Sequence, residues 1–411
     1  MRILILGACR QPQQWLVNAG HEAVLMTAKD KITLEDIKAS YRQVVVADAC
    51  SRPDLVGLAE HLHRIQKFEA VCCFTDTWQP LANRIADALG LARPVAPAVL
   101  ELTMNKSRMR AHLAEAGVEE TSFRLVESRQ QIEQALRDLG VPCILKPVDG
   151  EASSGVTRLD GDHDIDRAIA RFRESGHAFP VLVETFLTGE EYSVEAISEA
   201  GRHHVLAITK KYKDDITFVE NGHVVPAPLS AEVAHRIRAH VTRVLDAIGF
   251  AAGPSHSEIV LTDAGPRMVE THTRVGGDRI PELVRLASGI DLYELTARQA
   301  IGESIAERLP ATVTYHGAAA IWYAVPAVSP DLVLSRIEEE DAVRASPGIE
   351  TIQVAKQVGD RGSLVRSSLD RTALVIARGE NAGEALERAR AGAERLRFHY
   401  RWLPRCDREE T

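Results

Sequence analysis

The chain has 411 residues, of which 45% are hydrophobic, 26% charged and 5% aromatic, and its formal net charge at pH 7 is -9. This composition is typical of a globular protein and excludes disordered, collagen-like and coiled-coil classes. The negative charge disfavours nucleic acid or an anionic membrane as a main partner, and no apolar run approaches the roughly 18–20 residues that span a bilayer. At roughly 100–200 residues per domain, the length predicts two or three domains.

The first hundred residues alternate short apolar runs with helical segments. Strands that alternate with helices predict a parallel, doubly wound sheet. Gly7 opens the first strand-to-helix turn, but no GxGxxG follows it, so we interpret it as a turn glycine rather than part of a dinucleotide site. The expected strands are 2–6, 23–26, 44–47 and 70–74. A first helix is expected to contain 15–19 and to end at Gly20, a second to lie near 55–65, and a third to span 81–89.

Pro94 and Pro97 interrupt this pattern, and a region that mixes strands with helices then runs to about Pro310. A helix at 105–116 opens this region. Beyond Pro310 the expected strands are 318–324, 351–358 and 373–378, and the expected helix is 382–398.

The six cysteines form neither a CxxC pair nor a metal-like pattern; they are Cys9, Cys50, Cys72, Cys73, Cys143 and Cys406. In a chain of this size they predict reduced core thiols in a cytoplasmic protein. The opening segment 1–7 has too short an apolar core for a signal peptide and no small-residue cleavage site, which favours the same location.

The segment 144–156 places Lys146 at the end of an apolar strand, before a loop of small residues from Gly150 to Gly155. Such a loop lets backbone N–H groups approach phosphate oxygens, and a lysine adds positive charge. In a P-loop the lysine follows the loop instead, so a P-loop NTPase is excluded. From these residues alone, a flexible hairpin with an exposed lysine is an equal alternative.

The next segment, 181–195, has two expected strands around the Thr188-Gly189 turn, with Glu184, Glu191 and Glu195 at their edges. Carboxylates suit the exocyclic amine of adenine and the hydroxyls of ribose. The alternative for each glutamate is a solvated charge at a strand end.

A hairpin is expected further on, with strands at 257–262 and 267–274. Because strand residues alternate between faces, a loop of three or five residues would place Glu258, Glu270 and His272 on one face. Like charges so placed destabilise a hairpin, and a divalent cation with oxygen ligands, such as Mg²⁺, would remove that cost. A loop of even length would separate Glu258 from Glu270 and contradict a metal site.

In this order, the three segments resemble the ATP-grasp superfamily of carboxylate–amine ligases over nearly the whole chain. The resemblance implies an α/β fold, α+β in part. Its parts are an N-terminal doubly wound domain at 1–97, an ATP-grasp domain at 98–310 with a flap subdomain at about 120–185, a C-terminal α+β closing domain at 311–405 and a tail at 406–411.

The resemblance also implies the residues that bind ATP and metal. Lys106 and Lys146 match the two ATP lysines, the Gly150–Gly155 loop matches the phosphate-covering flap, and 184–187 resembles the adenine hinge. The implied ATP residues are Lys106, Lys146, Ser153, Ser154, Gly155, Glu184, Phe186, Leu187 and Glu191, the last for ribose; the implied metal ligands are Glu258 and Glu270.

One position departs from the family, which usually reads Glu-x-Asn where this chain reads Glu270-Thr-His272. Three roles are open for His272: a metal ligand, a hydrogen-bond partner of a group outside the metal's ligands, or a packing residue. The last two roles suit a hard ion such as Mg²⁺ better, and the number of metal ions stays open.

Within the superfamily, 218–229 resembles the FVExGHxxPA stretch of L-amino-acid ligases, the dipeptide synthetases of the bacilysin and dapdiamide type. The resemblance implies that His223 faces the amino-acid substrate, that Arg274 holds its carboxylate or the acyl phosphate, and that Lys211, or Lys210 in its place, meets the γ-phosphate. The alternative for His223 is a loop histidine held by the backbone. The segment 348–371 resembles the closing domain of these ligases and of biotin carboxylases.

Gly276, Gly277 and Asp278 follow Arg274 at the substrate end of the expected site. The small glycines leave room for a substrate side chain. Asp278 either favours a cationic group or caps Arg279 or the next helix.

The resemblance therefore implies a carbon–nitrogen ligase that activates a carboxylate as an acyl phosphate, passes it to an amine, and releases ADP and phosphate, as in dipeptide synthesis for antibiotic biosynthesis. ATP and Mg²⁺ are the implied cofactors, with Mn²⁺ as a substitute. The expected partners are the small-molecule acid and amine, without nucleic acid or membrane, and a homodimer is compatible with these features. The alternatives are a ligase of the purine-biosynthesis or biotin-carboxylase kind and a non-catalytic ATP-binding module.

Overall fold

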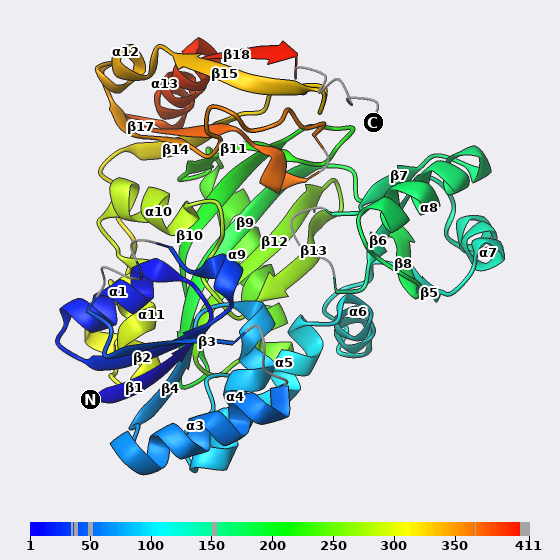
Figure 1. Cartoon of the computed structure of the whole chain (residues 1–411). Coiled ribbons are helices and arrows are strands. Elements are labelled where there is room, and N and C mark those ends of the chain that lie inside the picture. Colours follow the sequence, from blue (N-terminus) through cyan, green and yellow to red (C-terminus); the bar gives the residue numbers. More distant parts are fainter. Residues whose placement is uncertain (34–35, 37–39, 48–51, 150–153, 366, 403–411) are drawn as a thin grey trace, which may run out of the picture.

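The computed structural model describes residues 1–33, 36, 40–47, 52–149, 154–365 and 367–402, which form the parts shown in Figure 1. Its N-terminal part is a parallel four-stranded sheet in the order β3-β2-β1-β4. The strands are β1 (Arg2–Leu6), β2 (Glu22–Thr27), β3 (Gln43–Val46) and β4 (Ala70–Cys73). This confirms the predicted doubly wound sheet.

Both faces of this sheet are buried. Ile3 and Ile5 pack in a core on one face, and Leu4 and Leu6 pack in a core on the other. Helices α3 (Arg52–Gln66) and α4 (Gln79–Leu89) cover the second face. The first face packs on α1 (Arg10–Asn18) and on α11 (Leu292–Ala300), a helix that comes from the central region. The N-terminal part is therefore docked on the rest of the molecule through a shared core.

A small antiparallel sheet projects from the molecule, on the right in Figure 1, in the order β5-β8-β6-β7. Its strands are β5 (Phe123–Val126), β6 (Cys143–Pro147), β7 (Thr157–Leu159) and β8 (Val181–Thr185). Helices α7 (Arg129–Leu139) and α8 (Ile165–Glu174) bury Ile132 and Phe172 against it. This unit occupies the range predicted for the flap subdomain.

The largest sheet has eight strands in the order β13-β12-β9-β10-β11-β14-β17-β16. It runs through both the central and the C-terminal ranges, because β11 pairs with β14 across the predicted boundary near residue 310. Its strands are β9 (Glu190–Glu199), β10 (Arg202–Lys213), β11 (Glu220–Val225), β12 (Gly253–Thr262), β13 (Gly265–His272), β14 (Ala318–Ala324), β16 (Ile349–Val354) and β17 (Ala373–Gly379).

Helices enclose this sheet on both sides. One hydrophobic core joins it to α5 (Pro97–Thr103), α6 (Lys106–Glu115) and α9 (Ala231–Ala247), and a second joins it to α10 (Ile280–Ser288) and α11. In the C-terminal part, α12 (Glu340–Arg344) and α13 (Ala382–Arg395) pack on β14, β16 and β17, next to a two-stranded sheet of β15 (Leu332–Glu338) and β18 (Arg397–Trp402).

Two predicted elements end three or more residues earlier than expected. The expected helix at 382–398 ends at Arg395, and Phe398 lies in β18, where it pairs with Ile337. The expected strand at 351–358 begins at Ile349 and ends at Val354, which is the last residue to pair with β17.

Four cysteines within the described residues are free thiols: Cys72, Cys73 and Cys143 are buried and Cys9 is half-buried, while Cys50 and Cys406 lie outside those residues. None of the helices in the described part of the chain has the length and apolar character that a membrane crossing requires.

Candidate active site

Glu258 and Glu270 are direct cross-strand partners in the β12–β13 hairpin. Thr262 pairs with Gly265, so the loop between the strands has two residues. The expectation that the loop must have an odd number of residues was therefore wrong. A β-bulge compensates for the even loop length: Ile259 pairs with Met268, whereas Glu258 pairs with Glu270, which leaves Val269 as the extra residue. The bulge brings the two carboxylates to one face, as the metal-site prediction required.

Arg110 of α6 braces this bulge. Its guanidinium nitrogens donate to the carbonyl oxygens of Met268 at 2.6 Å and of Val269 at 2.9 Å. Its Nε donates to Glu184 at 3.1 Å, and the side chain is only 1% exposed. Sequence reasoning missed Arg110, although it stands one helical turn after Lys106.

Each carboxylate of the pair has a lysine and a histidine as neighbours. Glu258 lies 2.7 Å from Lys211 and 3.3 Å from His256, and Glu270 lies 2.9 Å from Lys106 and 3.1 Å from His272. Burial alone would raise the pKa of both carboxyl groups, but the neighbouring Lys211 and Lys106 ammonium groups outweigh it and hold both pKa values below their usual range. Both groups are therefore ionised.

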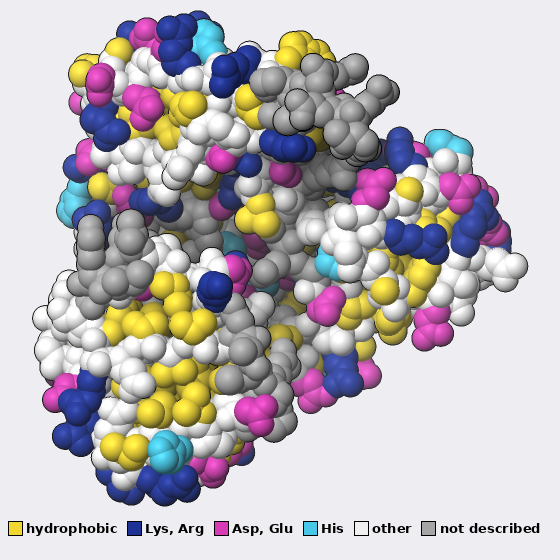
Figure 2. Space-filling view, in the orientation of Figure 1, with side chains coloured by type: hydrophobic (Ala, Val, Ile, Leu, Met, Phe, Trp, Pro, Cys, Tyr) yellow, Lys and Arg dark blue, Asp and Glu magenta, His cyan; other side chains and the backbone are white. Residues whose placement is uncertain are grey.

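Glu258 and Glu270 line two cavities. Figure 2 shows that the surface of the molecule is hollowed between its lobes. The first cavity contains most of the predicted ATP residues, after which we name it the nucleotide cavity: Lys106, Lys146, Ser154, Glu184, Phe186, Leu187 and Glu191. Ser153 lies outside the described residues, and Gly155 packs next to the cavity against His177 and Pro147.

Glu184 lines the nucleotide cavity, but its carboxylate is not free to bind adenine. One oxygen lies 2.5 Å from Lys146 and the other 3.1 Å from Arg110, and the residue is 4% exposed. The Arg110 and Lys146 charges outweigh the burial that would otherwise raise the pKa of Glu184, so it stays ionised. The predicted contact of this carboxylate with the base is therefore replaced by an ion pair that holds Lys146.

Lys210 and Lys211 point to opposite faces of β10, and of the two only Lys211 faces the site. Lys210 reaches away from the site, to Glu190 at 2.8 Å and over the Tyr192 ring. Lys211 lies inside the site, 2% exposed, and contacts three carboxylates: Glu191 at 3.3 Å, Glu220 at 2.8 Å and Glu258 at 2.7 Å. These carboxylates outweigh burial and raise the pKa of Lys211, so it is a permanent cation.

The second cavity, the substrate cavity, has Glu258 and Glu270 on one side and the C-terminal part on the other. Its lining includes the predicted residues Lys211, His223, His272, Arg274, Gly277 and Asp278, and adds Glu220, Ser368, Leu369 and Arg371, which were not predicted. His223 lies in β11 rather than in a loop, and its partner is a side chain rather than the backbone.

The two glycines differ in what they do. A Cβ on Gly276 would come within 2.8 Å of a Glu195 oxygen and 3.0 Å of a His256 nitrogen, so this glycine is required by packing. A Cβ on Gly277 would have no atom within 4 Å. Only Gly277 therefore fits the prediction that a glycine leaves room beside the substrate.

Asp76, in the one-turn helix Asp76–Trp78 after β4, brings the N-terminal part into the site. One carboxylate oxygen accepts from His272 Nδ1 at 3.0 Å and from Arg274 Nε at 2.7 Å. His272 Nε2 contacts Glu270, so both ring nitrogens have carboxylate partners. Of the three roles predicted for His272, this geometry favours the outer hydrogen-bond partner.

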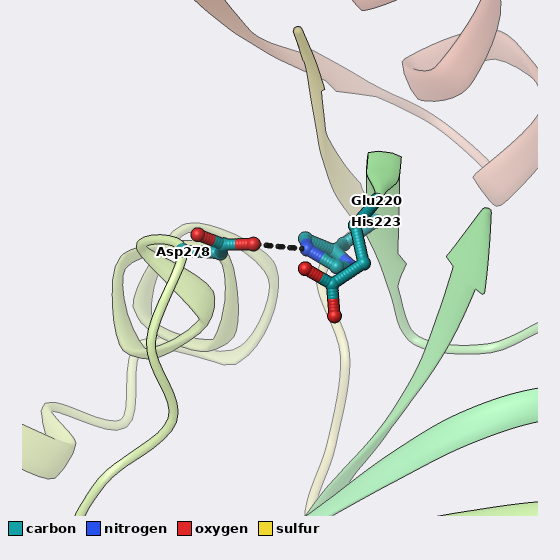
Figure 3. Close-up of side chains that lie close together, drawn as sticks. All are labelled: Glu220, His223 and Asp278. Atoms are coloured by element: carbon teal, nitrogen blue, oxygen red, sulfur yellow. Dashed lines mark hydrogen bonds and ion pairs between the residues drawn. The ribbon is translucent and has the colours of Figure 1, made fainter. Parts of the chain in front are cut away.

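Asp278 caps neither Arg279 nor α10. Its carboxylate is held by the Arg371 guanidinium and by His223 Nε2 at 3.0 Å, the bond drawn in Figure 3. Glu220, His223 and Asp278 are the one group of three that, among the described residues, offers clustered metal-ligand atoms. Because Arg371 already supplies a cation to both oxygens of Asp278, we assign no metal there.

Comparison with known proteins agrees with this architecture. Residues 139–282 match the ATP-grasp domain, and residues 330–401 match the L-amino acid ligase C-terminal domain 2. Uncharacterized protein y4rH of Sinorhizobium fredii is 26% identical over 362 residues, which cover 86% of this chain and 73% of that protein. Alanine–anticapsin ligase of Bacillus subtilis is 25% identical over 239 residues, which cover 53% of this chain and 50% of that protein.

Among solved structures, the L-amino acid ligase from Bacillus licheniformis superposes with a TM-score of 0.83. The superposition covers 97% of this chain and 98% of that protein, at 19% identity. It confirms the ATP-grasp fold that the sequence predicted.

Proposed function

Because the chain has an ATP-grasp domain followed by an L-amino acid ligase C-terminal domain, we propose that it is an ATP-dependent carbon–nitrogen ligase that joins an amino acid, or a similar acid, to an amine, itself an amino acid. The carboxylate is activated as an acyl phosphate, and ADP and phosphate are released. The main observation in support of this proposal is that Glu258 and Glu270 line both the nucleotide cavity and the substrate cavity.

In this proposal Lys106 and Lys146 bind the phosphates of ATP from the nucleotide cavity. Phe186 and Leu187 line the same cavity and supply apolar contact for the base. Glu191 binds the ribose hydroxyls, and to do so it gives up part of its ion-pair contact with Lys211 and Lys213. Glu184 acts indirectly, because its ion pair fixes the Lys146 ammonium group.

Glu258 and Glu270 would hold Mg²⁺, or Mn²⁺ in its place. The donor set fits, because both carboxylates are ionised, face each other across the hairpin, and are partly exposed to the cavities. When bound, the ion would neutralise charge on the transferring phosphoryl group. Without it, Lys106 and Lys211 neutralise the two carboxylates.

The remaining residues act on the acid and the amine. Arg274 lies in the substrate cavity beside Glu270 and orients the substrate carboxylate toward the γ-phosphate, while Asp76 fixes the direction of its guanidinium. Lys211, which contacts Glu258, meets the γ-phosphate. The flap at Ser154–Gly155 closes over the phosphates and keeps water from the acyl phosphate.

The test is a phosphate-release screen over pairs of amino acids with ATP and Mg²⁺. Phosphate release that needs two amino acids, with a new amide detected by mass spectrometry, supports the proposal. Release that needs bicarbonate or a ribonucleotide instead, or no ADP formation with any acid, would contradict it. A pair that resembles an antibiotic precursor would extend the proposal to antibiotic biosynthesis.

A further inference from the structure

Arg371 brings the C-terminal part of the chain into the substrate cavity. It stands between the one-turn helix Ser368–Asp370 and β17, and its guanidinium reaches Asp278 in the segment before α10. Two parallel hydrogen bonds join them: Nη1 to Oδ2 at 2.7 Å and Nη2 to Oδ1 at 2.5 Å. Such a bidentate pair fixes the plane and the direction of the carboxylate, which a single contact does not.

The guanidinium is itself held on its remaining sides. It stacks on the Tyr323 ring, with 3.8 Å from its central carbon to the ring centroid, and its Nε donates to the Ser368 carbonyl oxygen at 2.8 Å. The Tyr323 hydroxyl donates to the Asp278 carbonyl oxygen at 3.3 Å. Only 12% of the Arg371 side chain is exposed, so the ion pair between Arg371 and Asp278 is largely buried and is not a surface ion pair.

Asp278 needs such support because its backbone is strained. Asp278 and Arg279 have φ values of +51° and +58°, in the left-handed region that residues other than glycine seldom adopt. The contact with Arg371 stabilises this conformation and keeps the Asp278 carboxylate directed at β11. Without Arg371, we expect the segment to relax and the carboxylate to turn away.

His223 is the group that Asp278 reaches on β11. Its Nε2 lies 3.0 Å from Asp278 Oδ2, as Figure 3 shows, and the residue is 1% exposed. Its Nδ1 has no hydrogen-bond partner within the described residues. Because the carboxylate accepts the hydrogen bond from Nε2, Asp278 sets the orientation of the imidazole.

We propose that Arg371 is a positioning residue for the organic substrates, which acts through Asp278 on His223 and so makes the substrate cavity depend on the C-terminal part. This inference rests on the proposed function. Arg371 and Asp278 line the substrate cavity but not the nucleotide cavity, so they act on the acid or the amine and not on ATP.

The test compares Arg371→Ala and Arg371→Lys with Arg395→Ala, a control that removes an arginine 51% exposed and paired with Glu339. The probes are ATP and the amino-acid pair that releases the most phosphate in the screen. For Arg371→Ala we expect an ATP Kd within twofold of the unaltered protein and a KM for at least one amino acid raised tenfold or more. Arg371→Lys keeps the charge but not the bidentate geometry, so it should resemble Arg371→Ala.

A double variant tests the route through Asp278. If Arg371 acts on the substrates only through that carboxylate, Asp278→Asn combined with Arg371→Ala should raise KM no more than the larger single change does. If the increase in KM of the double variant equals the product of the two single increases, the inference is overturned. So would an Arg371→Ala protein that matches Arg395→Ala in every constant, or one whose ATP Kd rises by the same factor as KM.

Hydrogen exchange supplies a readout that needs no substrate. Amides of residues 276–280 should exchange at least tenfold faster in Arg371→Ala than in Arg395→Ala, and equal rates would contradict the positioning role. Faster exchange in a protein that ligates no amino acids would place the failure in the proposed function and keep the positioning role.

Discussion

Arg110 donates a hydrogen bond to the carbonyl oxygen of Val269 at 2.9 Å, although the two residues are 159 positions apart in the sequence. Val269 is the bulged residue that brings Glu258 and Glu270 to one face. The same guanidinium holds Glu184, which holds Lys146. One buried arginine thus fixes both the carboxylate pair and a predicted phosphate-binding lysine.

The first prediction is that Arg110→Met destabilises the protein by about 3–5 kcal/mol, because it leaves Glu184 short of a charge partner and two carbonyl oxygens unpaired in the core. Urea denaturation measures this change. The control is Arg108→Ala on the same helix, where the side chain is 57% exposed and the expected loss is below about 1 kcal/mol. Equal losses in the two variants would show that Arg110 is not the brace.

The second prediction concerns acid stability. Glu119 is 1% exposed; burial would raise its pKa, but His240 and the backbone N–H of Met268, 2.7 Å away, outweigh this and lower it from 4.5 to about 2. The stabilisation is therefore complete above the unfolded-state pKa near 4.5 and is lost as the pH falls toward 2.

Glu119→Gln should consequently cost about 3 kcal/mol at pH 7, and the difference from the unaltered protein should shrink between pH 4.5 and 2. Denaturant unfolding at several pH values measures it. Glu120→Gln is the control, since that carboxylate is 83% exposed and should give no such pH dependence. A difference that stays constant down to pH 3 would contradict the shifted pKa.

The third prediction is that Lys146→Ala weakens ATP binding at least tenfold and abolishes turnover while the protein stays folded. Glu184 keeps Arg110 as a charge partner, which limits the loss of stability. Calorimetric titration with ATP measures the affinity. Lys210→Ala is the matched control, because that lysine lies on the other face of β10. Unchanged ATP affinity in Lys146→Ala would remove this residue from the nucleotide site.

Much of the fold was predictable because local signals decide it. Neighbouring residues decide buried apolar runs such as β1 and glycine-capped helices such as α4, which ends at Leu89 with Gly90 as its C-cap. The end of α13 was missed because Phe398 continues a helical pattern, and its pairing with Ile337 is a tertiary contact. The bulge at Val269 in β13 has no local signal either, since Arg110 stabilises it from helix α6.

The candidate site shows the same division. Lys146 and Glu184 come from two segments that the resemblance assigns to one ATP site, so their presence in the same site could be predicted, but their ion pair could not. Asp76 and Arg371 come from segments on either side of the central region. Asp76 belongs to no motif, and the resemblance of 348–371 to a closing domain gave Arg371 no role in the site. They reach the site only because the N-terminal sheet packs on α11 and because β14 and β17 extend the central sheet.

The fourth prediction concerns Glu270. Removing its charge takes away the carboxylate that lies 2.9 Å from the Lys106 ammonium group, whose side chain is 13% exposed. Glu270→Gln should therefore lower stability without metal by about 1–3 kcal/mol, and turnover at millimolar Mg²⁺ should fall at least a hundredfold. Melting in EDTA and phosphate release measure the two effects. Near-normal turnover at low Mg²⁺ would show that Glu270 holds no metal.

The last prediction separates activation of the acid from binding of the nucleotide. Arg274 lies in the substrate cavity, and its Nε is fixed by Asp76. Because it orients the carboxylate and stabilises the transferring phosphoryl group, Arg274→Ala should keep ATP affinity within about threefold but lose at least a hundredfold in the rate of acyl phosphate formation. Hydroxylamine traps that intermediate as a hydroxamate when the acid is supplied without the amine.

Asp76→Asn provides a graded comparison for Arg274→Ala. It keeps the size of the side chain but weakens the hold on both Arg274 and His272, so its loss of hydroxamate should lie between that of the unaltered protein and that of Arg274→Ala. ADP, not AMP, should accompany the hydroxamate in every active variant. Detection of AMP, or normal hydroxamate formation in Arg274→Ala, would overturn the acyl phosphate route and leave Arg274 as a structural partner of Asp76.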